Sequence, residues 1–171
     1  MKLVLPSIEY KQSFLEACRE FQKEGVGETT GLYDIHEDGD FDAVVEKLKG
    51  QREGKYLPEG YVPHTVYFMV EGEKFIGHVD VRHRLNEHLL TVGGHIGYAI
   101  RPSERQKGYG TEILRQALTE ARELGLKKVL VTCSDDNIAS KRIIEKNGGV
   151  FENTSVTDAG VVKRRYWITQ E

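Results

Sequence analysis

The 171-residue chain has little cysteine and no long apolar segment. Its two cysteines, Cys18 and Cys133, are far apart and form no CxxC motif, which argues against a disulfide framework or a cysteine zinc site and fits a reducing cytosol. No run of about 18 apolar residues exists, so we expect no membrane span. The apolar run near the N-terminus is too short for a signal peptide. We therefore expect a cytoplasmic protein.

A strong net charge of either sign is also absent. The formal net charge is −3 at pH 7, so a general nucleic-acid binder is not expected. The length of 171 residues suits one domain with a sizeable core, and we predict a single domain over residues 1–171. His78, His83 and His88 recur at a spacing that fits neither a strand face nor a helix face, so no metal site is predicted.

Hydrophobic periodicity and turn residues predict a mixed α/β fold. We expect strands over 2–5, 64–72, 73–83, 95–101, 127–133, 149–156 and 161–169, and helices over 8–25, 41–51, 110–125 and 136–148. The strand at 127–133 is nearly continuously apolar, which is typical of a central strand covered on both faces. Together with the preceding strand and helix it forms a β-α-β crossover. The order of elements favours a mixed sheet flanked by helices.

The hexapeptide RQKGYG, from Arg105 to Gly110, stands between an expected strand and an expected helix. The first turn of a helix has unpaired N–H groups and a partial positive charge, and glycine lets the backbone approach a bulky anion. Arg105 and Lys107 add positive charge. The GxxxxGK[ST] pattern is absent, and Ile113 occupies the third glycine position of a dinucleotide fingerprint. We predict a phosphate-binding loop, with a plain glycine turn as the alternative.

Two longer stretches, GYAIRPSERQKGYGTEIL (97–114) and NIASKRIIEKNGG (137–149), resemble the GNAT superfamily of acetyl-CoA-dependent N-acetyltransferases. The first is similar to its motif A and the second to its motif B. The stretch at 82–105 and the late RYWI (165–168) are similar to a bacterial branch known mostly as predicted acetyltransferases. The resemblance implies a single-domain GNAT-like α/β fold, with a central twisted mixed sheet, splayed strands and flanking helices.

The resemblance also implies a site for acetyl-CoA as cosubstrate, without a metal. Pantetheine would run along the strand at 95–101, which would splay from the strand at 127–133 to admit it. Pyrophosphate would bind the backbone amides of 106–111. The motif B residues share one helix face because their spacing is i and i+3. The expected cofactor-binding residues are Tyr98, Ala99, Ile100, Arg105, Gln106, Lys107, Gly108, Tyr109, Gly110, Thr111, Asn137 and Ser140.

Acetyl transfer needs a neutral amine and a hydrogen-bond donor to the thioester carbonyl. A lysine-like amine is neutral in about one molecule per thousand at pH 7.4, a cost of about 4 kcal/mol that a general base offsets. His95 is the predicted base, with a purely structural hydrogen-bonding role as the alternative. Asp80 and His83 on the neighbouring strand are further candidates. A free backbone N–H near Tyr98 is the predicted donor to the carbonyl.

The acid that protonates the leaving thiolate departs from the pattern of the superfamily. The tyrosine that many members use would stand at Ile144, on the helix face that carries Asn137 and Ser140. Tyr166 on the closing strand is the predicted substitute, with packing beside Trp167 as the alternative. A thiol of pKa about 8.5 is already a fair leaving group near neutral pH, so the loss of the acid is tolerable.

The sequence therefore predicts an N-acetyltransferase that moves an acetyl group from acetyl-CoA to an amine by direct attack in a ternary complex. A non-catalytic acyl-CoA-binding module is the alternative, motivated by Ile144, and a nucleotide-binding enzyme is a third. The acceptor is a small-molecule amine or a protein amine, shaped by the loops at 25–40 and 55–64 and by the closing hairpin. The acyl-chain preference and the oligomeric state, a homodimer included, stay open.

Overall fold

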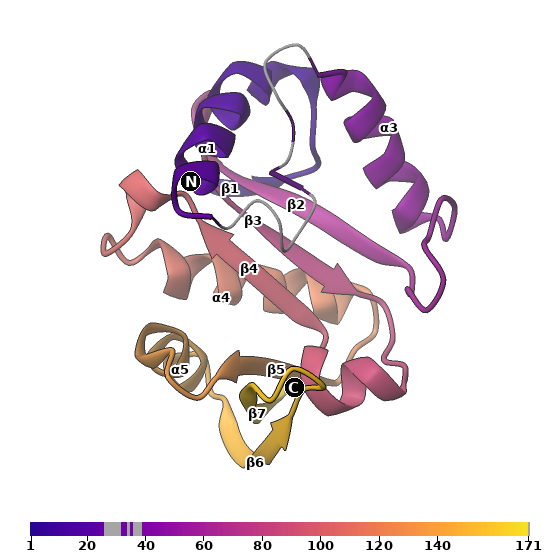
Figure 1. Ribbon diagram of the computed structural model, residues 1–171, viewed down its shortest axis with the longest axis vertical. Helices are drawn as coiled ribbons and strands as arrows, with labels where there is room; N and C mark the ends of the chain where they lie inside the picture. The colour runs from indigo at the N-terminus through magenta and orange to yellow at the C-terminus, as the bar shows by residue number, and fades with distance from the viewer. Residues whose placement is uncertain (26–31, 34, 36–38, 171) are drawn as a thin grey trace.

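The computed structural model describes residues 1–25, 32, 33, 35 and 39–170, which form one sheet of seven strands in the order β1-β2-β3-β4-β5-β7-β6 (Figure 1). The strands are β1 (Lys2–Val4), β2 (His64–Glu71), β3 (Lys74–Arg82), β4 (Ile96–Ile100), β5 (Lys128–Ser134), β6 (Val150–Val156) and β7 (Val162–Thr169). The helices are α1 (Lys11–Lys23), α3 (Phe41–Arg52), α4 (Tyr109–Glu123) and α5 (Ile138–Lys146). Short 3-10 turns lie at Ile8–Tyr10 and Pro102–Glu104, and a π-helix lies at Leu89–Gly93.

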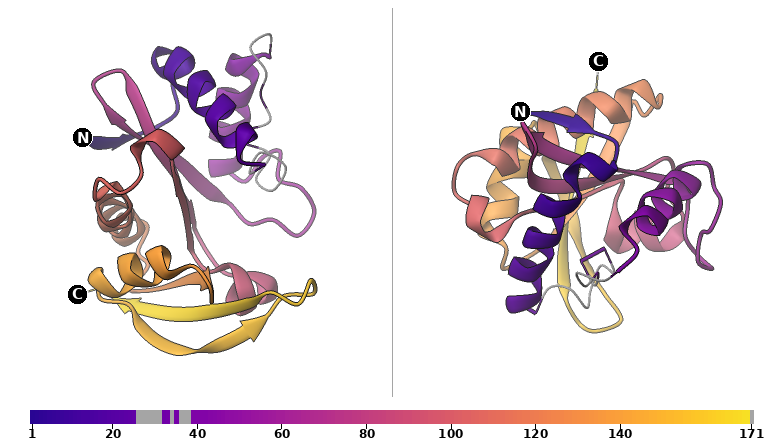
Figure 2. Two further views of the ribbon diagram at one scale, coloured as in Figure 1. Left: turned by 60° about the vertical axis from the view of Figure 1, so that its left-hand side comes forward. Right: turned by 90° about the horizontal axis from the view of Figure 1, so that it is seen from above.

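Helices pack on both faces of the sheet (Figures 1 and 2). On one face α1 and α3 pack on β2 and β3 through an aromatic core in which the rings of Phe14 and Phe68 stack 5.0 Å apart. On the other face α4 and α5 pack on the sheet around Met69, Ile113 and Leu114. Because β2 lies between both layers, every one of its residues from 64 to 70 is buried. The mixed α/β fold predicted from the sequence is confirmed.

The sheet divides between β4 and β5. These two strands are parallel, while the other neighbouring strands are antiparallel. Their ladder contains a single pair, Ile96↔Val131, although β4 stays paired with β3 as far as Ile100. After Ile96 the two strands therefore separate, and Figure 2 shows the β5-β7-β6 half of the sheet turned away from the other half. The predicted splayed strands are present.

Local signals placed most helix ends correctly. The side chains of Ser7, Asp40 and Asn137 each accept a backbone N–H at a helix start. One feature differs from expectation, because the π-helix before β4 was not predicted. Most of the predicted acceptor loop at 25–40 lies outside the described residues. None of the described helices is long and apolar enough to cross a membrane.

Candidate functional site

The backbone of β4 presents polar groups toward the side that β5 has left. The amide of Arg82 donates to the carbonyl of His95 over 2.8 Å, which makes the odd-numbered residues of β4 the ones bonded to β3. The even-numbered residues face the other way, and accordingly the carbonyl of Ile100 accepts Nε of Arg105 over 3.1 Å. Since the ladder to β5 ends at Ile96, the N–H and C=O groups of Tyr98 point between the separating strands.

The side chain of Tyr98 connects β4 to α5. Its hydroxyl lies 3.0 Å from that of Ser140, and Oδ1 of Asn137 accepts the amide of Ser140 over 2.9 Å. Burial raises the pKa of Tyr98 to about 12, although the bond to Ser140 acts in the opposite direction. The hydroxyl is therefore protonated at neutral pH. These three residues, which the sequence placed together, do lie together at the opening between β4 and β5.

The glycine loop ends in a left-handed backbone. Gly108 precedes α4 with a φ of +85°, and Gln106 has a φ of +63°, a conformation uncommon outside glycine. Left-handed residues in such loops turn successive N–H groups toward one point and make anion-binding concavities. Gly110 packs closely on α5, because an added Cβ would lie 2.5 Å from Cδ1 of Ile143. The loop thus lies where the start of α4 packs against the second half of α5, beside the end of β4.

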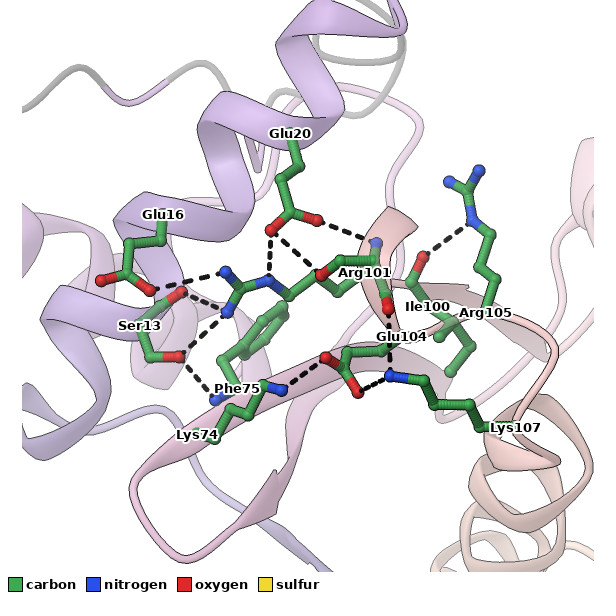
Figure 3. Close-up of polar contacts among 11 residues, drawn as sticks. Ser13, Glu16, Glu20, Lys74, Phe75, Ile100, Arg101, Glu104, Arg105 and Lys107 are labelled. Carbon is green, nitrogen blue, oxygen red and sulfur yellow. Dashed lines mark hydrogen bonds and ion pairs between the residues drawn. The ribbon is translucent and has the colours of Figure 1, made fainter.

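The two basic side chains of the loop are held by carboxylates, and Figure 3 shows the one that binds Lys107. Glu104 is 4% exposed and binds Nζ of Lys74 at 2.5 Å and of Lys107 at 3.0 Å. Burial alone would raise the pKa of Glu104, but the bonds to Lys74 and Lys107 outweigh burial and lower it. Arg105 pairs with Glu24 at 2.9 Å. The loop is consequently anchored to the β2–β3 hairpin and to the end of α1.

A buried arginine fixes the chain just before this loop (Figure 3). Arg101 is 8% exposed, and its guanidinium contacts Glu20 at 2.7 Å and Glu16 at 3.4 Å. Glu20 also accepts the amide of Ser103 over 2.9 Å. Sequence reasoning missed this network. The available signal was the spacing of Glu16, Glu20 and Glu24, which recur every four residues and so share one side of the helix.

His95 lies at the closed end of the gap between β4 and β5. It is 6% exposed, its Nδ1 accepts the amide of Leu130 over 2.9 Å, and its ring meets Trp167 edge-on. Burial lowers the pKa of His95 to about 4, so the ring is neutral at pH 7. A neutral ring that accepts at Nδ1 carries its proton at Nε2. His95 as a base therefore has to give up its bond to Leu130.

Tyr166 stands one strand from the point where β4 and β5 part. It pairs with Val131, which itself pairs with Ile96. Its hydroxyl donates to Glu145 of α5 over 3.3 Å and accepts Nε of Arg164 over 3.2 Å. Burial raises the pKa of Tyr166, so its hydroxyl holds a proton. A proton donor at this place stays a prediction.

Two expected absences bear on the chemistry. Ile144, where many members of the superfamily carry tyrosine, is fully buried in the core under α5. Within the described part of the chain no group of three or more His, Cys, Asp or Glu side chains could hold a metal ion. Polar groups near the opening include the backbone amides of β4 and the side chains of Tyr98, Ser140 and His95.

Comparison with known proteins gives a family match and several similar structures. The family described as acetyltransferase (GNAT) domain matches residues 37–150. The uncharacterized N-acetyltransferase YnaD of Bacillus subtilis is 28% identical over 127 residues, which cover 64% of this chain and 72% of that protein.

Two solved structures share the fold at low identity. The microcin C7 self-immunity acetyltransferase MccE, in complex with acetyl-CoA and AMP, has a TM-score of 0.71 at 16% identity, over 98% of this chain and 91% of that one. A Salmonella typhimurium acetyltransferase that modifies the N-terminal serine of ribosomal protein L7/L12 has a TM-score of 0.65 at 15% identity, over 99% and 94% of the two chains.

Proposed function

The chain belongs to the GNAT acetyltransferase family, and on that premise we propose that it transfers the acetyl group of acetyl-CoA directly to an amine while both are bound. We further propose that residues 1–171 form one domain of this kind. The single observation that carries the proposal is the separation of β4 from β5 after Ile96, beside a glycine loop at the start of α4. An open strand edge binds an extended chain, and a helix start binds phosphate.

In this proposal acetyl-CoA occupies the gap between β4 and β5. Pantetheine adds to β4 as an extra strand along Tyr98, Ala99 and Ile100. Its pyrophosphate binds the backbone amides of Gln106 to Thr111. Asn137 and Ser140 line the arm from α5. The ion pairs of Arg105 and Lys107 position the loop, and both side chains remain partly exposed for contact with phosphate oxygens.

The groups that would assist acetyl transfer lie on β4 and on strands near it. The amide of Tyr98 faces the gap and would donate to the thioester oxygen as negative charge develops there, an interaction of about 3 kcal/mol in comparable oxyanion sites. Tyr166, whose hydroxyl is protonated at neutral pH, would donate a proton to the leaving thiolate in place of its bond to Glu145. The sequence predicted His95 as the base, with a structural role as the alternative, and its bond to the amide of Leu130 favours the structural role.

Direct attack on the thioester is favoured over an acyl-cysteine intermediate. Cys133 on β5 is the cysteine near the gap, but it is buried, and burial raises the pKa of its thiol. A thiol with a raised pKa supplies little thiolate, which is the nucleophilic form. We therefore expect no acetyl group on the protein after incubation with acetyl-CoA alone, as intact-mass measurement would show.

An amine acceptor is supported by the modification reported for the Salmonella relative, whose target is an N-terminal serine. That amine belongs to a protein, while small-molecule amines fit the same chemistry. A panel of acceptors should therefore contain a lysine-like alkylamine, an amino-acid amide and a short peptide with a free N-terminus.

Ligand-dependent melting and thiol release test the proposal. Acetyl-CoA and CoA should each raise the melting temperature, and ATP and NAD should not. Thiol release on addition of one of the panel amines identifies an enzyme. Stabilisation by acetyl-CoA without thiol release for any amine would favour the non-catalytic binding module, and stabilisation by ATP or NAD instead would favour a nucleotide enzyme.

A further inference from the structure

Asp80 lies on β3, one strand away from the edge at which the thioester is proposed to bind. It pairs with Gly97, the neighbour of Tyr98, and Oδ2 contacts Nη2 of Arg82 at 3.2 Å. The other carboxylate oxygen, Oδ1, is buried and has no hydrogen-bond partner. Among the described residues, no other buried side-chain oxygen or nitrogen lacks a partner. Buried polar atoms are nearly always bonded, so this free acceptor calls for an explanation.

The position opposite Asp80 on β4 carries no side chain and is covered by Arg82. Gly97 has no side chain, and a Cβ added there would meet only the guanidinium nitrogens of Arg82, at 3.7 and 3.8 Å. Adjacent strands lie about 4.8 Å apart, so a ligand added to the far edge of β4 would be about 10 Å from the backbone of Asp80. To bridge that distance, the proposal requires the aspartate side chain and one or two water molecules.

Arg82 holds the carboxylate in place. Its Nη1 donates to the carbonyls of Gly94 and Gly93, at 3.1 and 3.4 Å, while its Nη2 contacts Asp80. The guanidinium is thus fixed between the start of β4 and the carboxylate. One oxygen of Asp80 is held by this contact, and the other stays available as a proton acceptor.

We propose that Asp80 is the general base of the reaction, reached by the acceptor amine through water and oriented by Arg82. This inference rests on the proposed acetyl transfer. The amine nitrogen forms a bond to the thioester carbon, and its proton passes through water to Oδ1 of Asp80. The C–S bond breaks with its electron pair on sulfur, and the resulting thiolate takes up a proton. Asp80 then returns its proton to solvent.

The surroundings of Asp80 agree with this role. Burial raises the pKa of Asp80, while the guanidinium of Arg82 acts in the opposite direction. His64 comes from β2, Arg82 lies on β3 and His83 follows directly after it, and β4 contributes only Gly97 at this position. A carboxylate with a raised pKa is a stronger base than an exposed one. Unlike His95, Asp80 has a lone pair that no protein group uses.

The test compares Asp80→Asn with wild type and with Asp42→Asn, an exposed aspartate on α3, in thiol release with the most active amine of the panel. Asp80→Asn should keep its melting temperature and acetyl-CoA affinity but lose about 100-fold in kcat/KM.

The pH profile is the second part of the test. Below the pKa of Asp80 the wild-type plot of log kcat/KM against pH should steepen from slope one to slope two, because both the amine and Asp80 must lose protons. Asp80→Asn should keep slope one, and formate should partly restore Asp80→Ala.

The outcomes separate the two proposals. If wild type releases thiol with an amine and Asp80→Asn keeps its rate within about threefold with an unchanged pH profile, Asp80 is not the base and the acetyl transfer stands. If no amine gives thiol release with wild type, the transferase function fails and this inference fails with it. If Asp80→Asn does not fold, Asp80→Glu is tested instead. A shift in the acidic part of its plot of log kcat/KM against pH supports the inference, and an unshifted plot overturns it.

Discussion

The hydroxyl groups of Tyr98 and Ser140 lie 3.0 Å apart and join β4 to α5 across the opening between β4 and β5. This bond holds the strand whose backbone is proposed to bind the thioester against the helix proposed to line the pantetheine arm. Tyr98 therefore has two separate roles, a proposed catalytic role of its backbone amide and a structural role of its hydroxyl. The amide points into the gap, whereas the hydroxyl is engaged with Ser140.

Tyr98→Phe tests that separation. The substitution keeps the backbone amide and removes one hydrogen bond, so stability should fall by about 1 kcal/mol and kcat by less than about fivefold. Ser140→Ala removes the same bond from the other side and should behave alike. A loss of kcat by 100-fold or more in Tyr98→Phe alone would contradict the assignment of catalysis to the backbone.

Gly108→Ala tests the glycine loop. Gly108 has a φ of +85°, and a Cβ there would meet no atom within 4 Å, so the substitution acts through backbone strain of about 1 kcal/mol. We expect a several-fold rise in the KM for acetyl-CoA with little change in kcat. Gly125→Ala is the matched control, because Gly125 has a φ of +82° and equally open surroundings at the far end of α4. Equal effects of the two variants on KM would remove the loop from the cofactor site.

Glu104→Gln tests the anchoring of the loop. The buried carboxylate binds Lys74 and Lys107, and its replacement should lower the free energy of unfolding by about 1 to 2 kcal/mol and raise the KM for acetyl-CoA. Glu53→Gln is the control, since the Glu53–Lys55 pair has a 2.6 Å contact but is exposed. Urea unfolding and initial rates measure both effects. Indistinguishable stabilities of the two variants would show that the buried pairs contribute nothing.

His95→Asn and His95→Leu decide between the two roles of His95. Asparagine can present Oδ1 to the amide of Leu130 in place of Nδ1, and leucine cannot. A structural role predicts that the Asn variant is folded and active, while the Leu variant loses about 1 to 3 kcal/mol of stability. A base role predicts that both variants lose about 100-fold or more in kcat/KM.

The pH dependence of stability tests the burial of two histidines. Burial lowers the pKa values of His78 and His95 from 6.5 to about 4. The unfolded chain binds these protons at a higher pH than the folded protein does. The stabilisation of the folded state by each neutral histidine is therefore complete above pH 6.5. It is lost as pH falls through 4, by up to about 3 kcal/mol for each histidine. Urea midpoints between pH 7 and 4 measure it. His95→Asn should flatten the curve and the exposed His88→Asn should not; the reverse pattern would contradict the assignment.

The elements of the fold could be predicted because their signals are local. The stripe of Ile113, Leu114, Ala117 and Ala121 marks α4, and the apolar run at β5 marks a strand covered on both faces. Cap residues such as Asp40 and Asn137 set the helix starts. The π-helix before β4 carries no such pattern, because its backbone is set by the packing of Val92 and by the bond from Thr132 to the carbonyl of Val92.

The site was less predictable because it depends on contacts between distant residues. The glycine loop and the motif B residues are marked by short motifs. Nothing in the sequence shows that Arg101 reaches Glu20, 81 residues away, or that Glu104 is shared by two lysines. The free oxygen of Asp80 likewise becomes visible only when β2, β3 and β4 are in register.

Simultaneous measurement of CoA thiol and acetylated amine in one reaction tests the central claim most directly. The wild-type protein is mixed with acetyl-CoA and the amine panel, and thiol and acetyl-amide are quantified over time. Acetyl transfer by direct attack predicts equal amounts of the two products and no thiol release before the amine is added. Thiol release without acetyl-amide, or neither product with any amine, would contradict it.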